Sequence, residues 1–280
     1  GLGDVYKRQV TGGVPKYIEL FSESGDIYRA IQKCVLNRSG YLYDEPHFLL
    51  QQEVSEVGSY FSIIKAIAAG NHKLSSIASV LEVKSTNLTK YLKTLMDLDI
   101  LERRVPVTEE NPEKSKRGLY KIKDNYLRFW FAFIYPNMSF IESGHSGIVM
   151  DKIRKGLTTS HIGFVYEDIC EERMWELNVN NTWPFQFSKL GGYWDAKNEI
   201  DIAALDPEGK NLILGECKYW KEPVGLNVLH ALEAKVCDVA WERDRRKVWY
   251  VLFSISGFSD ELRNHAATRD DLLLIDDGER

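Results

Sequence analysis

The pattern of apolar and polar positions divides the chain into a helical first half and a second half in which strands and helices mix. From residue 59, the stretches YFSIIKAIAAG, KLSSIASVLEV and KSTNLTKYLKTLMDLDIL each repeat apolar residues at helical spacing. The stretches ILERRVPVT and GLYKIK then flank the polar loop EENPEKSKR and predict two strands. Three helices followed by a two-stranded wing predict a winged helix-turn-helix over residues 58–123.

The second half predicts a long helix close to residues 160–177, followed by strands and crossover helices. Strands are expected around 185–194 and at 199–205, 211–219, 247–254 and 271–276, with helices at 225–240 and 259–267. This order predicts an α/β domain with a mixed sheet over residues 158–280. The fold class expected for the whole chain is multi-domain and α+β overall.

Two other segments are predicted to be helical without carrying obvious chemistry. Residues 10–57 contain helices expected at 26–37 and 46–55, and residues 124–157 are expected to form a helical linker. The linker begins with the aromatic stretch DNYLRFWFAFIYPN. Its Phe and Trp side chains are interpreted as core or interdomain packing, not as a base-stacking surface.

The first nine residues, GLGDVYKRQ, resemble the translated adapter sequence found at the ends of reading frames assembled from metagenomes. Residues 1–9 are therefore left out of the fold prediction. The sequence begins with Gly instead of Met, and we expect the chain to be the C-terminal piece of a longer protein.

Composition favours a protein of a reducing compartment. The four cysteines are widely spaced and include no CxxC pair, which is typical of free thiols. No apolar run approaches the roughly 18 residues that a membrane-spanning helix needs, and no signal peptide is visible. We expect a cytoplasmic protein without membrane contact; the sequence does not determine its oligomeric state.

The candidate chemistry lies in the stretch NEIDIAALDPEGKNLILGECKYW. Alternation along a strand places Glu216 and Lys218 on one face and Cys217 on the other. A hairpin turn at DPEG brings Asp201 of the preceding strand close to Glu216. Two carboxylates and a lysine within apolar strands predict a site for Mg²⁺ or Mn²⁺, because Mg²⁺ prefers oxygen ligands and uses one or two carboxylates. The alternative is a solvated strand face with ordinary surface ion pairs.

The same alternation predicts the faces of the first strand of this hairpin. Glu199, Asp201 and Ala203 are expected on one face, with Ile200 and Ile202 on the other.

Asp201 followed by Glu216-Cys217-Lys218 resembles the D…(D/E)xK core of the PD-(D/E)xK nuclease superfamily, which has the restriction-endonuclease-like fold. The resemblance implies that Asp201 and Glu216 bind metal and that Lys218 assists catalysis. It also implies an auxiliary acidic residue in the preceding helix, for which the candidate is Glu167. An exposed helical glutamate is the alternative interpretation of Glu167.

A wider resemblance covers residues 10 to the end. The stretches TGGVPKYIELF, YFSIIKAIAAG, KSTNLTKYLKTL, LRFWFAFIYPN and EIDIAAL…LGECKYW resemble the C-terminal part of prokaryotic ATPases that carry a DUF234 domain. That family combines an AAA/STAND-like ATPase, a winged helix and a nuclease-like DUF234 domain. By this comparison Gly12, Gly13 and Pro15 correspond to the GxP motif of the ATPase lid, near the nucleotide of the complete protein.

The chain departs from this family pattern because it contains no G-x-x-x-x-G-K-S/T phosphate loop. ATP binding is therefore expected only in a longer protein that includes the ATPase domain. That missing N-terminal domain is one expected partner of the chain.

The distribution of charge suggests nucleic acid, most simply DNA, as a second partner. The net charge is −5, yet residues 59–123 contain twelve Lys or Arg and seven Asp or Glu, so this segment carries +5 and the remainder −10. Lysines and hydroxyl groups suit contacts to phosphate, whereas base readout favours residues such as Asn. The candidate DNA-binding residues are Lys84, Thr86, Asn87, Lys90, Lys93, Lys114, Lys116 and Arg117. A solvated charged face, or a winged helix that binds protein, is the alternative.

Three functions remain open from the sequence. The first is a Mg²⁺-dependent nuclease-like phosphodiesterase positioned on DNA by the winged helix. The second is a catalytically inactive nuclease fold that binds DNA or the ATPase domain and has a regulatory role. The third is a structural arm that contacts the ATPase domain.

Overall fold

The computed structural model describes residues 10–278, apart from the side chains of residues 159 and 160. The segment interpreted as an adapter-like sequence, residues 1–9, lies outside the described residues. Within the described part of the chain, no helix is both long enough and apolar enough to cross a bilayer.

Internal contacts gather the chain into two compact units. The first unit comprises the residues up to 104 together with 118–162, and the second comprises 105–117 and the residues from 163 onward. This division differs from the consecutive segments predicted by the sequence. The segment 124–157, expected to be a linker, belongs to the first unit, and the loop of the expected wing belongs to the second.

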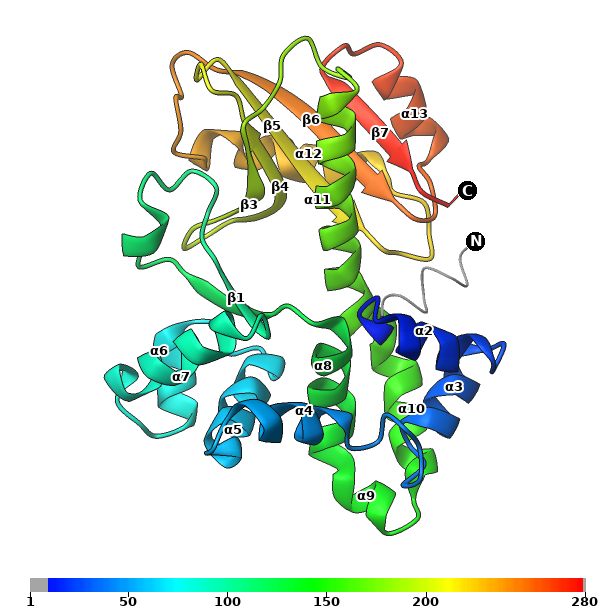
Figure 1. The fold of residues 1–280 in the computed structure, drawn as a ribbon. Helices are drawn as coiled ribbons and strands as arrows, with labels where there is room; N and C mark the ends of the chain where they lie inside the picture. Colours follow the sequence, from blue (N-terminus) through cyan, green and yellow to red (C-terminus); the bar gives the residue numbers. More distant parts are fainter. Residues whose placement is uncertain (1–9, 279–280) are drawn as a thin grey trace. The chain divides into compact units, whose positions relative to one another are not determined.

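The first unit is mostly helical (Figure 1). Its elements are α2 (Pro15–Ser22), α3 (Ile27–Cys34), α4 (Glu45–Glu53), α5 (Val57–Ala68), α6 (Leu74–Val80), α7 (Ser85–Asp97), β1 (Leu101–Arg104), β2 (Leu119–Ile122), α8 (Asn125–Phe129), a π-helix (Trp130–Ile134), a 3-10 helix (Tyr135–Asn137), α9 (Met138–Glu142), α10 (Ser146–Leu157) and a second π-helix (Thr158–Ile162).

The element order predicted for residues 58–123 is present. Helices α5, α6 and α7 are followed by the antiparallel pair β1–β2, whose register runs from Leu101 opposite Ile122 to Arg104 opposite Leu119. The apolar stripe of α7 is buried, as its helical spacing indicates.

The aromatic stretch that opens the expected linker is core. Phe129, Trp130 and Phe131 are each at most 1% exposed. The Trp130 indole donates a hydrogen bond from Nε1 to the Tyr43 carbonyl at 2.9 Å. The interpretation of these rings as packing residues is confirmed, but a segment buried to this degree is not a free linker. The stretch consists of α8, the π-helix and the 3-10 helix in succession, and the last of these contains Pro136, which lacks the N–H that a regular helix needs.

The second unit contains the mixed sheet. Its elements are a 3-10 helix (Pro112–Lys114), α11 (Gly163–Val179), β3 (Lys189–Trp194), β4 (Glu199–Leu205), β5 (Asn211–Lys218), α12 (Leu226–Lys235), a 3-10 helix (Val236–Asp238), β6 (Lys247–Ser254), α13 (Asp260–Ala266) and β7 (Leu272–Asp276).

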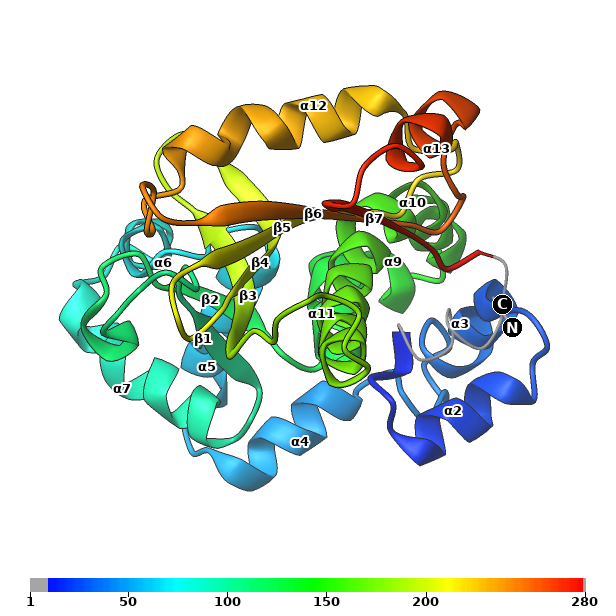
Figure 2. The same cartoon turned by 90° about the horizontal axis from the view of Figure 1, so that it is seen from above.

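In this unit the sheet lies between α11 on one face and α12 and α13 on the other (Figures 1 and 2). The strand order is β3-β4-β5-β6-β7; the pairs among β3, β4 and β5 are antiparallel, and those among β5, β6 and β7 are parallel. Leu214 of β5 packs in the cluster that contains Leu229 of α12. On the other face, Cys217 packs in the cluster that contains Met174 of α11. The prediction of a mixed sheet with helices on it is confirmed.

Strand β4 contains a β-bulge. Its pairing with β3 shifts between Gly191 and Tyr193, so that Asp201 and Ile202 together lie opposite Gly192 alone. Such bulges re-aim side chains and interrupt the pairing of the strand. Here the interruption falls on a residue of the candidate site.

The bulge overturns the predicted faces of β4. Ile200 packs with Ala203 in the cluster on the α12 face, whereas Ile202 packs in the cluster on the α11 face. The prediction that Ile200 and Ile202 share a face, opposite Glu199, Asp201 and Ala203, is therefore wrong. A period of two no longer holds across an inserted residue.

The loop 105–117 lies along the edge strand β3. The Val107 N–H donates to the Gly192 carbonyl at 3.0 Å, and the Trp194 indole donates to the Arg117 carbonyl at 3.0 Å. The Val107 side chain packs against the core cluster on the α12 face. The loop thus covers part of a sheet edge, where backbone groups would otherwise face solvent.

Candidate functional site

Strands β4 and β5 bring together the three residues singled out by the sequence. The Lys218 ammonium lies between the two carboxylates, with Nζ 3.2 Å from Asp201 Oδ2 and 2.5 Å from Glu216 Oε2. Asp201 Oδ2 also accepts the Cys217 backbone N–H at 2.8 Å. The last paired residues of the hairpin at this end are Ile202 and Gly215, so the Asp201 side chain takes the place of a backbone partner just beyond them.

A fourth charged residue, which the sequence analysis missed, completes the cluster. Lys235, the last residue of α12, places Nζ 2.7 Å from Glu216 Oε1 and 2.7 Å from the Glu199 carbonyl. A signal for it was present. Lys235 follows Leu232 by three residues and Val228 by seven, both of them buried, so helical spacing places it on the face that packs against the sheet.

The cluster is mostly withdrawn from water. The Glu216 side chain is 8% exposed, and those of Asp201 and Lys218 are 16% and 19% exposed. Two carboxylates and two ammonium groups balance in formal charge. Because burying an ion costs several kcal/mol unless it is paired, this balance is what makes the cluster tolerable in the folded protein.

The protonation equilibria reflect this environment. Burial, together with the charge of Glu216, raises the pKa of Asp201 above its usual 3.8. Burial alone would also raise the pKa of Glu216, but Lys218 and Lys235 outweigh it and hold that pKa below its usual 4.5. Burial acts to lower the pKa of Lys218, and the two carboxylates outweigh it and raise that pKa. At neutral pH Lys218 is therefore a charged hydrogen-bond donor and not a base.

The auxiliary candidate, Glu167, lies on α11. Its charge contributes to raising the pKa of the buried Cys217 thiol, after burial itself, the neighbouring Cys170 and the charge of Asp201. Across residues 10–278, however, no three His, Cys, Asp or Glu side chains gather closely enough to hold a metal ion. Glu167 is therefore not part of a three-ligand group with Asp201 and Glu216.

The donor set fits a hard divalent cation held by two carboxylates and water. Asp201 and Glu216 supply oxygen ligands, and their repulsion is one cause of the raised pKa of Asp201. The same set does not fit a metal that needs three protein ligands.

The candidate DNA-binding residues fall into two groups. Lys84, Thr86, Asn87, Lys90 and Lys93 are all exposed, on α7 or directly before it.

The second group lies on the loop 105–117, in the other unit. Lys114 and Lys116 are exposed, whereas Arg117 donates from Nε to Glu109 Oε1 at 2.6 Å and from Nη1 to the Trp194 carbonyl. These interactions engage the guanidinium of Arg117 within the second unit. Arg117 is exposed and stays a predicted phosphate-binding residue, for which a phosphate would compete with Glu109.

The glycine pair of the expected lid motif has a defined structural role. Gly12 and Gly13 have φ values of +65° and +79°, which glycine adopts without strain, and Pro15 begins α2. A Cβ on Gly12 would lie 2.8 Å from Asp124 Oδ2, so a larger residue does not fit there. The geometry explains the glycines without a nucleotide.

Comparison with known proteins gives a relative of similar sequence. The uncharacterized protein MJECL04 of Methanocaldococcus jannaschii is 38% identical over 210 residues, which covers 75% of this chain and 46% of that protein. The chain thus spans about half the length of the curated relative that it matches.

Among solved structures, a repair endonuclease from Pyrococcus abyssi matches with 12% identity and a TM-score of 0.26, over 38% of this chain and 45% of that one. At this score the likeness supports no statement about fold or function.

A family model matches residues 130–235, a segment that begins at Trp130 and ends at Lys235 and includes Asp201, Glu216 and Lys218. The family is described as archaea bacterial proteins of unknown function. Residues 130–235 of this chain are therefore identified as a DUF234 domain.

Proposed function

We propose that Asp201, Glu216 and Lys218 form the centre of a Mg²⁺-dependent phosphodiesterase of the PD-(D/E)xK type, in a restriction-endonuclease-like fold. The observation that carries the proposal is the single ammonium group of Lys218, held within 3.2 Å of one carboxylate and 2.5 Å of the other on adjacent strands. An exposed ion pair costs little to form, whereas charges as buried as these cost several kcal/mol to withdraw from water, so a function would explain why they are kept.

In this proposal Asp201 and Glu216 hold the metal. When bound there, a Mg²⁺ ion would polarise a phosphoryl oxygen and lower the pKa of a coordinated water. Other residues of the chain bind the phosphate and orient the two carboxylates. Lys218, charged at neutral pH, donates to the non-bridging oxygens on which negative charge develops. Lys235 fixes the orientation of the Glu216 carboxylate through Oε1, and the Cys217 N–H fixes that of Asp201. Glu167 is retained as an auxiliary acid outside this group.

A winged helix-turn-helix made of α5, α6, α7 and the β1–β2 pair would hold the chain on DNA. Support comes from the exposed lysines of α7, since sequence-independent affinity for DNA comes mainly from phosphate neutralisation. Replacing Lys90 and Lys93 by Ala is expected to weaken binding to a random-sequence duplex. It should also reduce the slope of log K against log salt by about 0.9 for each phosphate group that the variant no longer neutralises. Fluorescence anisotropy measures both, with Lys152→Ala as the control.

In the complete protein, an ATPase domain preceding this chain is proposed to control the site. The support is the length of the relative, of which the chain spans 46%, together with the glycine pair that resembles a lid motif. Nucleotide is proposed to bind near Gly12, Gly13 and Pro15 only when that domain is present.

The second candidate is an inactive nuclease-like module that binds DNA or the ATPase domain. The observation that favours it is the pairing of both carboxylates with lysines, which satisfies the cluster without a metal. A metal ion must therefore displace at least one ammonium group to enter. The two candidate functions differ in whether a metal ion displaces this ammonium group and binds.

Calorimetry with Mn²⁺ and Mg²⁺ distinguishes them. The native chain is expected to bind one ion per chain, and the variant Asp201→Asn/Glu216→Gln none, because the amides remove the charge of both ligands. The control Glu208→Gln/Asp244→Asn removes two exposed carboxylates elsewhere in the same unit and should bind as the native chain does.

Cleavage of end-labelled single-stranded, duplex and branched DNA is then measured with the same variants. Metal-dependent cleavage that is absent from the double variant supports the phosphodiesterase. If the native chain binds no metal, with or without DNA, the inactive module is the correct assignment.

A further inference from the structure

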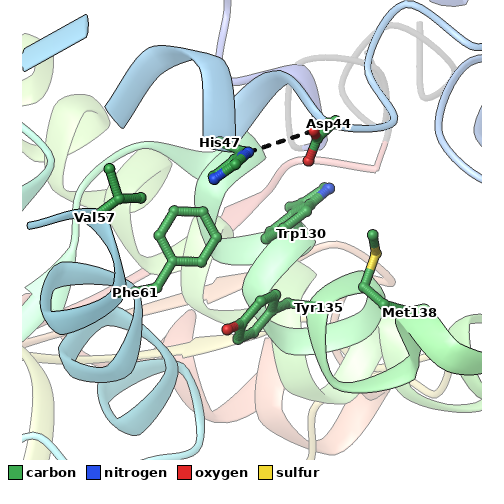
Figure 3. A pocket seen from close by; sticks show the side chains of 8 residues that line it. Asp44, His47, Val57, Phe61, Trp130, Tyr135 and Met138 are labelled. Carbon is green, nitrogen blue, oxygen red and sulfur yellow. Dashed lines mark ion pairs between the residues drawn. The ribbon is translucent and has the colours of Figure 1, made fainter. Parts of the chain in front are cut away.

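An aromatic pocket lies in the first unit, among residues to which the proposed nuclease chemistry gives no part (Figure 3). Its volume is about 290 Å³, and it opens to solvent. The lining comes from the start of α4, the start of α5 and the segment after α8. Among the residues that line it are Asp44, His47, Phe61, Trp130, Tyr135 and Met138.

The π-helix builds one wall of this pocket. Trp130 and Tyr135 are five residues apart, and their rings stack with centroids 5.4 Å apart and an interplanar angle of 27°. In an α-helix, residues five apart point about 140° away from each other and do not stack. The wider turn of the π-helix at Trp130–Ile134 brings them onto the same side. Isolated π-turns of this kind occur frequently at functional sites.

Further interactions hold the rings in place. Phe61 meets Trp130 and Tyr135 edge-on, with centroids 5.9 and 5.2 Å apart, and His47 meets Phe61 at 88°. The hydrogen bond from Trp130 to the Tyr43 carbonyl fixes the indole. The pocket is thus preorganised: four rings stand in fixed orientations around a space that opens to water.

The charges near the pocket favour a cation. Aromatic ring faces carry negative electrostatic potential. Asp44 adds a carboxylate at the rim, where its Oδ2 lies 3.5 Å from His47 Nδ1. Residues 41–58 contain four Asp or Glu and no Lys or Arg. The Lys65 ammonium lies over the Tyr135 ring, 5.8 Å from its centroid, so this ring already has a cation within the range of a cation–π contact.

We propose that this pocket binds the ammonium end of a lysine side chain from a partner polypeptide. The volume is at the lower limit of the roughly 300–1,000 Å³ of pockets that enclose drug-sized ligands, and it suits one side chain. The exposed Phe48 and Leu49 of α4, at 57% and 42%, offer an apolar surface to the residues that flank such a lysine. Asp44 and the half-buried Tyr135 ring select the charge, and the walls select an unbranched alkyl chain.

The methyl group of Met138 reports occupancy directly, because ring currents around it change when a ligand enters. The chain has four methionines, so a protein labelled with ¹³C at the methionine methyl gives four signals, and Met138→Leu assigns one of them. The probes are N-acetyl-lysine methylamide and N-acetyl-norleucine methylamide, which differ by the ammonium group. Choline is the third probe.

The lysine probe is expected to shift the Met138 signal to saturation and to bind at least about tenfold more tightly than the norleucine probe. Asp44→Asn should weaken lysine binding about fivefold or more with no change for norleucine. Asp151→Asn, an exposed carboxylate elsewhere in the unit, should change neither. Lys65→Gln should tighten lysine binding, because it removes a competing charge.

Three results would overturn the proposal. Equal affinity for lysine and norleucine would make the pocket merely apolar. The absence of a saturable shift with lysine would mean that no such site exists. Choline binding more than tenfold tighter than lysine would assign the pocket to a quaternary ammonium ligand instead. Far-ultraviolet circular dichroism of each variant establishes that it is folded before its binding is compared.

Discussion

The carboxylate–lysine cluster of the second unit and the aromatic pocket of the first are built by opposite means. The cluster gathers four formal charges on two strands and a helix end, with the least exposed carboxylate at 8%. The pocket gathers rings on helices, with the Asp44 carboxylate at its rim. Charges in the cluster satisfy one another, whereas the pocket is a space open to solvent whose aromatic walls, Trp130 and Phe61 among them, are packed into the core.

The two sites differ in what an entering cation has to displace. A cation that enters the cluster must displace an ammonium group from Asp201 or Glu216. A cation that enters the pocket meets Asp44 and aromatic side chains, and Lys65, which lies over the Tyr135 ring, opposes it by charge without lining the pocket. Binding at the cluster is therefore expected to be coupled to a rearrangement of side chains, and binding at the pocket is not.

Lys218→Met should produce the largest loss of stability. The substitution leaves Asp201 and part of Glu216 buried without their shared partner, and we expect unfolding free energy to fall by about 3 kcal/mol, the lower end of the cost of breaking a buried pair. Urea denaturation followed by circular dichroism measures it. Lys221→Met, which removes an exposed lysine three residues further along, is the control and should change stability by less than about 0.5 kcal/mol.

If Lys218→Met left stability unchanged, the two carboxylates would have to be hydrated in the native protein, and the cluster would no longer contrast with the surface. The same variant should also abolish any metal-dependent cleavage, because no other ammonium group bridges the two carboxylates among the described residues.

Trp130→Phe changes a wall of the pocket. It should lower the unfolding free energy by about 2 kcal/mol, less than Lys218→Met does. The smaller ring keeps a wall in place, but it cannot form the hydrogen bond to the Tyr43 carbonyl, and a space opens in the core. The same denaturation experiment measures the change, with Trp175→Phe on the exposed face of α11 as the control. A loss as small as that of the control would show that the indole is not held as the structure describes.

The pH dependence of stability at Glu216 is expected to be the smallest of these effects. The folded-state pKa of Glu216 lies below its usual 4.5, so its ionised form contributes stability above that pH, and this contribution is lost as pH falls through the folded-state value. The difference in unfolding free energy between the native chain and Glu216→Gln should therefore shrink as pH drops below 4.5. A series of denaturation experiments from neutral pH down to well below that value gives the comparison.

The pKa of Asp201 is shifted in the opposite direction, so Asp201 provides the matched comparison. Because this pKa is raised, the ionised form of Asp201 opposes folding. The contribution of Asp201 to the unfolding free energy therefore becomes more favourable as pH falls toward the usual 3.8. The unfolding free energy of Asp201→Asn, relative to that of the native chain, should accordingly fall as the pH is lowered. Parallel pH profiles for the two variants would contradict the assignment of opposite shifts.

Much of the second unit follows from the sequence pattern. The strands expected at 199–205 and 247–254 are observed as Glu199–Leu205 and Lys247–Ser254. The DPEG turn closes as predicted, with Gly209 at φ +71° and Asp206 Oδ1 accepting the Lys210 N–H. Turn chemistry and apolar runs are local properties, and local properties can be recognised without a tertiary fold.

Other features required the packed structure. Lys235 is nineteen residues from Glu216, and the pair depends on how α12 crosses the sheet. The bulge at Asp201 depends on the pairing with β3, opposite Gly192, and no residue of β4 signals it. The π-helix interrupts a stretch whose apolar pattern is that of an ordinary helix. The loop 105–117, which follows β1 in the sequence, packs with the second unit because Val107 finds its apolar neighbours there.

The order of elements, the mixed sheet and the proximity of Asp201 to Glu216 and Lys218 follow from the sequence, because a short turn joins the two strands of one hairpin and alternation holds along β5. The tertiary structure decided which further groups complete each site. Lys235 neutralises Glu216, and Phe61, Trp130 and Tyr135 enclose a pocket, through interactions between elements far apart in the chain. Such interactions depend on packing and charge balance across elements, which a pattern along one strand or helix does not encode.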